Sequence, residues 1–231
     1  MRQAPGLGGI LFILLIVASI ASCLGDDLKP SRSVIDVPRI KAPIQLEDFL
    51  KSKRLEKLKK IGSFVQTGRN EGIPAIHQTE AYLAHDDSLL IVFFVCSGPT
   101  HSSVDSESTK AKSQSSKEWV EVVIDLFGDL RRSYVFRTNP TGLRQQGEFL
   151  QGVYASDVNQ PWYSECQLTD KGYVVELSIP YASFDPNFAN PALHRIWGLR
   201  LRRWLSDTQE YIHWPGPNEQ EAKSQGRSHS D

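Results

Sequence analysis

Short runs of alternating apolar and polar residues recur after residue 62 and predict β-strands. In 119–126 (WVEVVIDL), every second residue from Val120 is apolar, whereas Glu121 and Asp125 fall on the opposite face. Similar strands are expected at 134–139, 173–179, 197–204 and 210–214. Strands of this length, separated by turn signals, are typical of a mainly antiparallel β-sandwich.

A predicted hairpin precedes these strands. It joins 79–83 (TEAYL) to 89–95 (LLIVFFV) through the turn signal Asp86-Asp87. The second strand is apolar throughout, which indicates burial on both of its faces. Upstream, the spacing of apolar residues in 47–60 predicts one short, solvated amphipathic helix.

The N-terminus has the pattern of a secretory signal. Met1 and Arg2 give a positive start, 10–20 (ILFILLIVASI) is continuously apolar, and small residues precede Cys23. The run is short for a membrane-spanning helix, although an uncleaved anchor is an alternative. The segment also fits a bacterial lipoprotein signal, in which Cys23 would be lipidated. We expect an exported protein in the periplasm or at the outer membrane or cell surface of a bacterium, touching membrane only through the leader or a lipid anchor.

The expected organisation has four segments. They are a signal peptide at 1–23, an extended lead-in at 24–45, the β-sandwich at 46–215 and a disordered tail at 216–231. Within the sandwich, 101–117 is rich in Ser, Thr and Lys without an apolar anchor, which predicts a mobile loop.

Charge and cysteine content exclude some partners. The formal net charge of −1 gives no basic surface for nucleic acid. Beyond Cys23 there are two cysteines, too few for a disulfide framework or a zinc site. Cys96 lies in an apolar run, which favours a buried free thiol, and a bridge from it to Cys166 stays open.

Catalytic motifs are absent from the sequence: it has no nucleophile motif, phosphate loop or dinucleotide fingerprint. A glycosidase needs two carboxylates facing each other across a cleft. Glu121, Asp125 and Glu176 are candidates, but each lies in mid-strand, where a structural carboxylate is at least as common. We therefore name no catalytic residue and expect binding rather than catalysis.

A carboxylate and an arginine on neighbouring predicted strands suit sugar binding. Glu121 and Arg137 lie on the polar faces of two strands joined by a short connection. Sugar hydroxyls pair with charged groups, and the C–H faces of sugar rings stack on aromatic rings. The alternative is a cross-strand salt bridge on a solvated sheet face.

Short motifs spread along the chain resemble a known family in their order. They include 119–142 (WVEVVIDLFGDLRRSYVFRTNPTG), 71–90 (EGIPAIHQTEAYLAHDDSLL), 172–184 (GYVVELSIPYASF) and 197–204 (WGLRLRRW). The chain resembles family 9 carbohydrate-binding modules over 38–215, in particular the copy at the N-terminus of bacterial outer-membrane β-barrel proteins. This resemblance implies a β-sandwich that grips a sugar ring between two tryptophans.

The resemblance also implies particular site residues. Glu121 and Arg137 match positions that hydrogen-bond sugar, and Trp214 lies near one stacking position. The second stacking tryptophan would fall near Ser115, so Trp119 is its nearest substitute.

Two further residues complete the candidate list. Asn139 shares the face of Arg137, and Trp162 is expected on an exposed loop where it could extend the sugar platform. Trp197 and Trp204 are expected in the core. Calcium is implied by the resemblance alone, without ligands that the sequence identifies.

Three hypotheses on function result. The first is a non-catalytic, exported carbohydrate-binding module that serves polysaccharide binding or breakdown, with an oligo- or polysaccharide as its partner. The second is a structural or interaction domain that has lost sugar binding. The third is an accessory fragment of a glycoside hydrolase acting on O-glycosyl bonds.

Overall fold

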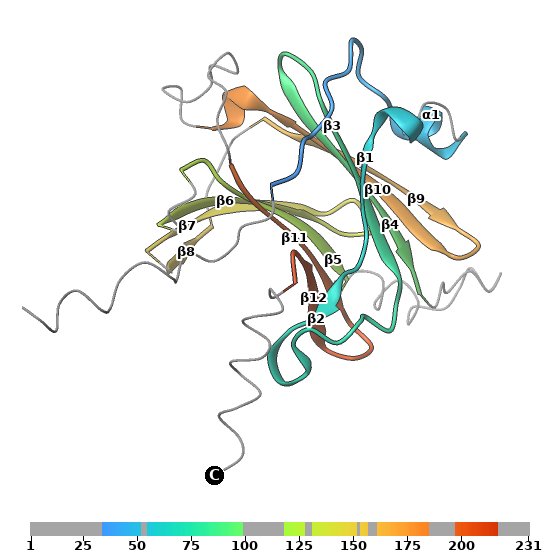
Figure 1. The fold of residues 1–231 in the computed structure, drawn as a ribbon, viewed down its shortest axis with the longest axis vertical. Helices are drawn as coiled ribbons and strands as arrows, with labels where there is room; N and C mark the ends of the chain where they lie inside the picture. The colour runs from blue at the N-terminus through green and yellow to red at the C-terminus, as the bar shows by residue number, and fades with distance from the viewer. Residues whose placement is uncertain are drawn as a thin grey trace, which may run out of the picture. The chain divides into compact units, whose positions relative to one another are not determined.

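The alternating strands form two antiparallel sheets in the computed structural model (Figure 1). The structure describes residues 34–51, 55–98, 118–127, 131–151, 153–156, 161–184 and 197–216. The signal segment with Cys23, the predicted loop at 101–117 and nearly all of the predicted tail lie outside these residues. All described residues after Val34 belong to one compact unit.

Each sheet mixes strands from distant parts of the chain. Sheet A contains, in spatial order, β1 (Lys59–Ile61), β3 (Thr79–His85), β4 (Leu89–Ser97), β10 (Gly172–Pro180) and β9 (Tyr163–Thr169). Sheet B contains β2 (Val65–Gln66), β12 (Glu210–Trp214), β11 (Gly198–Leu205), β5 (Trp119–Asp125), β6 (Arg132–Thr138), β7 (Arg144–Leu150) and β8 (Val153–Ala155). Three short 3-10 turns occur at Leu55–Lys57 (η1), Gly68–Asn70 (η2) and Tyr181–Ser183 (η3).

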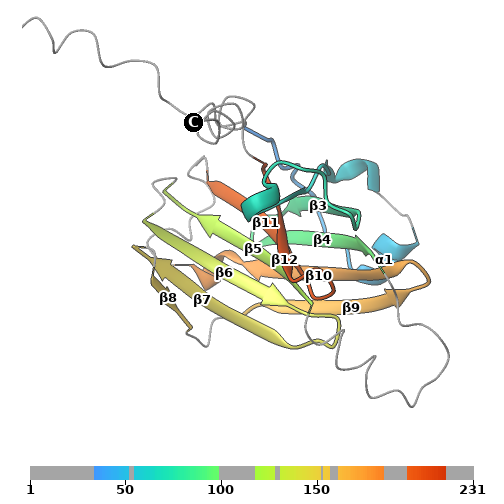
Figure 2. The ribbon, with the colours of Figure 1, turned by 90° about the horizontal axis from the view of Figure 1, so that it is seen from below.

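The main core lies between the two sheets, which Figure 2 shows as two layers. Val120, Val122 and Ile124 of β5 are fully buried there, as their alternation predicted. Leu177 and Ile179 of β10 contribute from the other sheet. The predicted β-sandwich is therefore confirmed.

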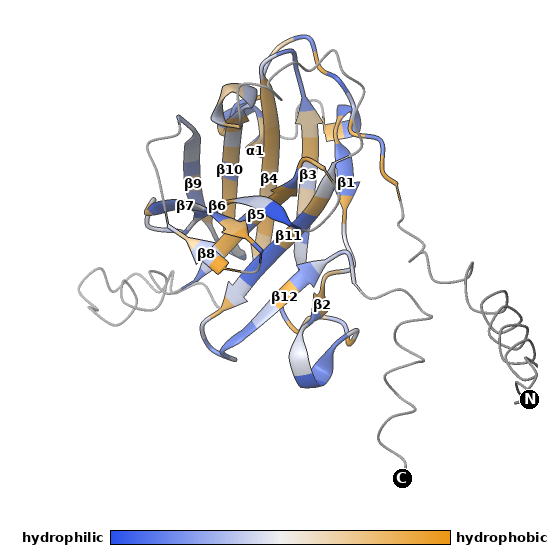
Figure 3. Cartoon of the chain, turned by 90° about the vertical axis from the view of Figure 1, so that its left-hand side faces the viewer, coloured by the Kyte–Doolittle hydropathy of each residue, from blue (hydrophilic) through white to orange (hydrophobic). Residues whose placement is uncertain are grey.

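A second apolar layer covers the outer face of sheet A. It consists of the lead-in and α1 (Leu46–Leu50) packed on β4 and β10, whose apolar character is visible in Figure 3. The rings of Phe49 and Phe93 stack with centroids 4.3 Å apart. This layer explains the continuous apolar run of β4, which is buried on both faces as predicted.

The helix predicted over 47–60 is wrong in its length. Among the described residues of this segment, only Leu46–Leu50 is α-helical, and η1 and β1 follow. β1 pairs with β3, with Lys60 opposite Tyr82. An isolated helix of this length is marginal in water, so strand pairing and burial of the adjoining residues decide the conformation.

Arg203 of β11 crosses the sandwich between the sheets. It is 1% exposed, and its Nη1 donates hydrogen bonds to Thr79 Oγ1 (3.0 Å) and the Ser97 carbonyl (2.8 Å). Its Nη2 donates to Glu118 Oε2 at 3.1 Å, and Glu118 also accepts from the Tyr173 hydroxyl at 2.9 Å. One guanidinium therefore ties β11 to β3 and β4 across the core.

Cys96 and Cys166 are both free thiols. β10 separates them, because Cys96 lies opposite Tyr173 and Cys166 lies opposite Val175. Two strand spacings amount to about 9.5 Å, beyond the roughly 7 Å that a disulfide spans. Burial, followed by the neighbouring Cys96, raises the pKa of the Cys166 thiol to about 12.

Replacing Arg203 should destabilise the fold strongly. Arg203→Met would leave the Glu118 carboxylate without its guanidinium partner, which typically costs about 3–5 kcal/mol for a buried pair. Arg200→Met, at an exposed position of the same strand, should change the free energy of unfolding by less than about 0.5 kcal/mol. Urea denaturation measures both values, and equal losses would contradict the bridging role of Arg203.

Candidate functional site

The outer face of sheet B carries a row of polar side chains across five strands. The register places His213, Arg202, Glu121, Arg137 and Gln145 side by side on β12, β11, β5, β6 and β7. Their sequence neighbours on β5 and β11 face the core, so alternation turns this row away from sheet A.

Glu121 is the centre of the row and is only 1% exposed. Arg202 Nε donates to Glu121 Oε2 at 2.8 Å, and Arg202 Nη2 donates to the same oxygen. The other oxygen, Oε1, accepts from the Tyr211 hydroxyl at 3.2 Å and lies 3.7 Å from Arg137 Nη1. Both carboxylate oxygens are thus engaged by neighbouring strands.

Aromatic rings support the two guanidiniums. Arg137 lies over the Trp119 ring and Arg202 over the Tyr211 ring, each 4.9 Å from the centroid. Arg137 Nε also donates to Gln145 Oε1 at 2.8 Å. The side chains of Arg137 and Arg202 are 28% and 24% exposed, so both remain accessible to a ligand.

The local charge favours donation of hydrogen bonds to a ligand. Two guanidiniums share the single carboxylate of Glu121, which leaves one net positive charge. Burial, and next the charge of Glu121, raises the pKa of Tyr211, so its phenol stays protonated as a donor. Together these groups offer N–H donors beside flat aromatic faces.

The carboxylates considered as catalytic candidates do not form a facing pair. Glu121 and Asp125 lie on the same strand, and Asp125 is buried and accepts a hydrogen bond from the Phe127 amide at 3.0 Å. Glu176 lies on β10 of the other sheet. Glu176 is therefore on a different sheet from Glu121 and Asp125.

The structure brings three of the predicted residues together, namely Glu121, Arg137 and Trp119. Trp214 does not join them, because it lies opposite Leu201, whose side chain is in the core, and it packs against that core. An aromatic wall from Trp214 beside Glu121 is thus a wrong prediction. The alternation of β12 turns Tyr211 and His213 to the site instead.

Asn139 and Trp162 are also engaged elsewhere. Asn139 is fully buried at the end of β6, where its Oδ1 accepts from the amides of Thr141 (3.1 Å) and Leu143 (2.9 Å). Trp162 is 6% exposed and packs edge-on against Phe136 in the core. The predicted exposure of Trp162 is wrong, because its ring packs into the core against Phe136.

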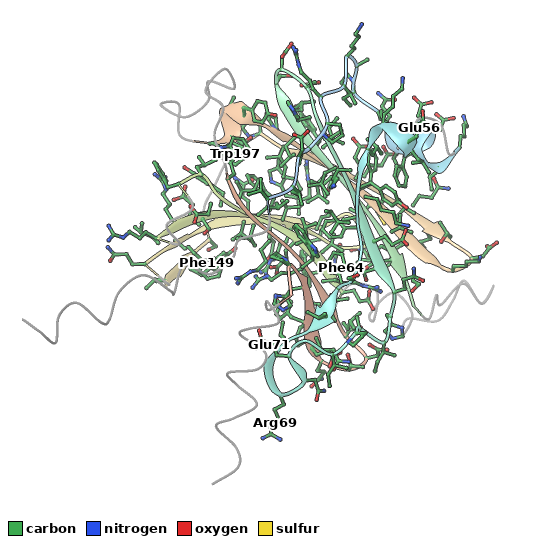
Figure 4. All side chains as sticks on the ribbon, in the orientation of Figure 1. Glu56, Phe64, Arg69, Glu71, Phe149 and Trp197 are labelled. Atoms are coloured by element: carbon green, nitrogen blue, oxygen red, sulfur yellow. The ribbon has the colours of Figure 1, made fainter. Side chains whose placement is uncertain are left out.

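Sequence reasoning missed Arg202, Tyr211, Trp204 and Gln145 as members of the site. Trp204 was expected in the core, yet it lies opposite Trp119 on the outer face, with its ring 4.8 Å from that of Tyr211. Alternation within 197–204 (WGLRLRRW) could have located Trp204. It places Trp204 on the same face as Arg202, opposite to the face of the core residue Leu201. Trp197 does pack against the core, beside Tyr181 and Phe184, as expected (Figure 4).

Metal-ligating side chains do not cluster in the described part of the chain. Among the described residues, no group of three or more His, Cys, Asp or Glu side chains could hold a metal ion. In the same part of the chain, no helix is long and apolar enough to cross a membrane.

Comparisons with known proteins identify structural relatives. No protein-family model matches the sequence, and no curated protein matches it. A solved Bacteroides uniformis ATCC 8492 protein, whose assignment as carbohydrate-binding is provisional, matches with a TM-score of 0.55 and 12% identity over 80% of this chain and 91% of its own. A family 9 carbohydrate-binding module from Caldicellulosiruptor kristjanssonii, solved with cellotriose and with glucose, gives a TM-score of 0.49 and 16% identity over 76% of this chain and 81% and 84% of the two structures. The match with a TM-score of 0.55 shows that the two proteins share a fold, an antiparallel β-sandwich.

His213 should make stability depend on pH. Burial, then the charges of Arg200 and Arg202, lowers its pKa below the ordinary 6.5, against an opposing effect of Glu71. The unfolded chain therefore binds a proton more readily than the folded chain, and the free energy of unfolding should fall as the pH drops below about 6.5. Denaturation at several pH values should show a flatter dependence for His213→Gln, and parallel curves would contradict this assignment.

Proposed function

We propose that this protein binds an oligo- or polysaccharide on the outer face of sheet B. The observation that carries the proposal is the pair of partly exposed guanidiniums, Arg137 and Arg202, held by buried Glu121 next to Trp119 and Tyr211. Guanidinium N–H groups suit the oxygens of sugar hydroxyls, and aromatic rings suit the apolar faces of sugar rings.

In this proposal Glu121 positions the arginines, and the arginines contact the sugar. Its oxygens already accept hydrogen bonds from Arg202 and Tyr211, and its side chain is 1% exposed. Because both guanidiniums are fixed before the ligand arrives, less side-chain entropy is lost on binding. The resemblance to family 9 modules assigns a direct contact to Glu121, whereas its burial supports an indirect role.

One observation favours the second candidate function, a structural or interaction domain. Both carboxylate oxygens of Glu121 already accept hydrogen bonds from protein side chains. An ion-pair network that binds no ligand would show the same arrangement. Such a network stabilises the pairing of β11, β5 and β6, and it needs no sugar. Direct titration separates the two functions.

Arg137→Ala should weaken binding of gluco- or xylo-oligosaccharides by about 1.5–3 kcal/mol, the worth of a hydrogen bond to a charged group. The matched control is Arg39→Ala, which removes an exposed arginine paired with Asp87 far along the chain from the site. Isothermal titration calorimetry measures both affinities. Wild-type protein that binds no glucan or xylan oligomer would support the structural candidate, and binding that survives Arg137→Ala would place the site elsewhere.

We also propose that the protein is exported to the cell envelope of a bacterium. The apolar run at 10–20 and the small residues before Cys23 support this proposal. Mass spectrometry of the mature protein should find about the first twenty residues removed. If Cys23 is lipidated, Cys23→Ser should release the protein from membranes, whereas an intact Met1 on a cytosolic product would contradict export.

A further inference from the structure

A second aromatic pair lies on the outer face of sheet B. Phe149 of β7 is opposite Ser133 of β6 and Tyr154 of β8. Tyr134, the neighbour of Ser133, faces the core, so Phe149 and Tyr154 face outward as Arg137 does. Their rings lie 5.2 Å apart, and Figure 4 labels Phe149 near the end of the β7–β8 hairpin.

The Tyr154 ring packs on the backbone at Gly147. A Cβ at Gly147 would lie 2.7 Å from Tyr154 Cε2 and 2.5 Å from the Ala155 carbonyl oxygen. A glycine is therefore required for the ring to rest on the β7 backbone. Phe149 supports the ring from the side, yet Tyr154 remains 36% exposed. The result is an aromatic surface that is fixed in place and open to solvent, and we call the pair Phe149 and Tyr154 the shelf.

The shelf continues the row of the candidate site. Gly147 is two residues beyond Gln145 on β7, about 7 Å along the strand, and it lies opposite Val135. Val135 in turn lies opposite Val123 of β5. A path over the sheet thus runs from Trp119 past the arginines and across these valines to the shelf. A polar centre with aromatic surfaces on both sides matches a chain of sugar rings better than a single ring.

We propose that the shelf is a second stacking subsite, which binds the continuation of the saccharide chain whose first ring is held at Arg137 and Arg202. This inference rests on the proposed function and adds the ligand class, an oligosaccharide of several units. Three observations support this inference: the Tyr154 ring is exposed, it packs on Gly147, and it lies in line with the row of guanidiniums. A second copy of the protein would be the competing occupant of such an edge.

Tyr154→Ala should leave the affinity for the shortest bound saccharide unchanged and lower that for longer oligomers by about tenfold. The probes are cello- and xylo-oligosaccharides of increasing length, titrated by calorimetry. Tyr154→Phe keeps the ring and should bind like wild type. The matched control is Tyr163→Ala, which removes a tyrosine that is 63% exposed on β9 of the other sheet and should change no affinity.

The outcomes separate this inference from the proposed function. The second subsite would be contradicted if wild-type affinity were independent of oligomer length, or if Tyr154→Ala lowered the affinity equally at every length. Either result would leave the proposed sugar binding unaffected. A shift from dimer to monomer in Tyr154→Ala, with oligosaccharide affinity intact, would assign the shelf to self-association and overturn the inference. Absence of binding by wild type at all lengths would overturn both proposals.

Discussion

The pairing of β5 with β11 is the constraint on which both the fold and the candidate site depend. Adjacent arginines on β11 point to opposite faces, Arg202 outward and Arg203 inward. Each meets a carboxylate of the β5 segment, Glu121 on the outside and Glu118 on the inside. Residues that are an odd number of positions apart on a strand point to opposite faces. Glu118 and Glu121 are three apart, so they face opposite sides, as the adjacent Arg202 and Arg203 do. If β5 slipped by one residue against β11, Glu121 would point into the core. The Glu121–Arg202 and Glu118–Arg203 pairs would then separate, so these ion pairs favour the observed register.

The two outer faces of the sandwich have different roles because only one carries an apolar layer. The lead-in and α1 cover sheet A, so β4 is buried on both sides and serves the core. The outer face of sheet B instead carries partly exposed arginines and aromatic rings. The candidate site therefore lies on sheet B, where neighbouring strands hold each side chain at a fixed spacing.

The candidate site is built as a rigid arrangement of cations. Burial of Glu121 would be costly for an isolated charge, and two guanidiniums and a phenol compensate for it. The aromatic rings beneath Arg137 and Arg202 limit their motion and shield one side of each. A ligand thus meets donors that are already oriented, and this is the property that a binding surface for hydroxyl-rich molecules requires.

The sequence by itself determined β3, β4, β5, β6, β10, β11 and β12, the hairpin across Asp86-Asp87 and the polar faces that carry Glu121 and Arg137, because period-two alternation is a local property of the backbone. It did not locate Trp214 and Trp204, because alternation groups residues by face without saying which face of β11 and β12 packs against the core. Nor could it limit the helix to Leu46–Leu50, where pairing of β1 with β3 outweighs a weak local preference. Tertiary structure alone brought Arg202 and Tyr211 to Glu121, since 80 residues or more of chain separate these partners.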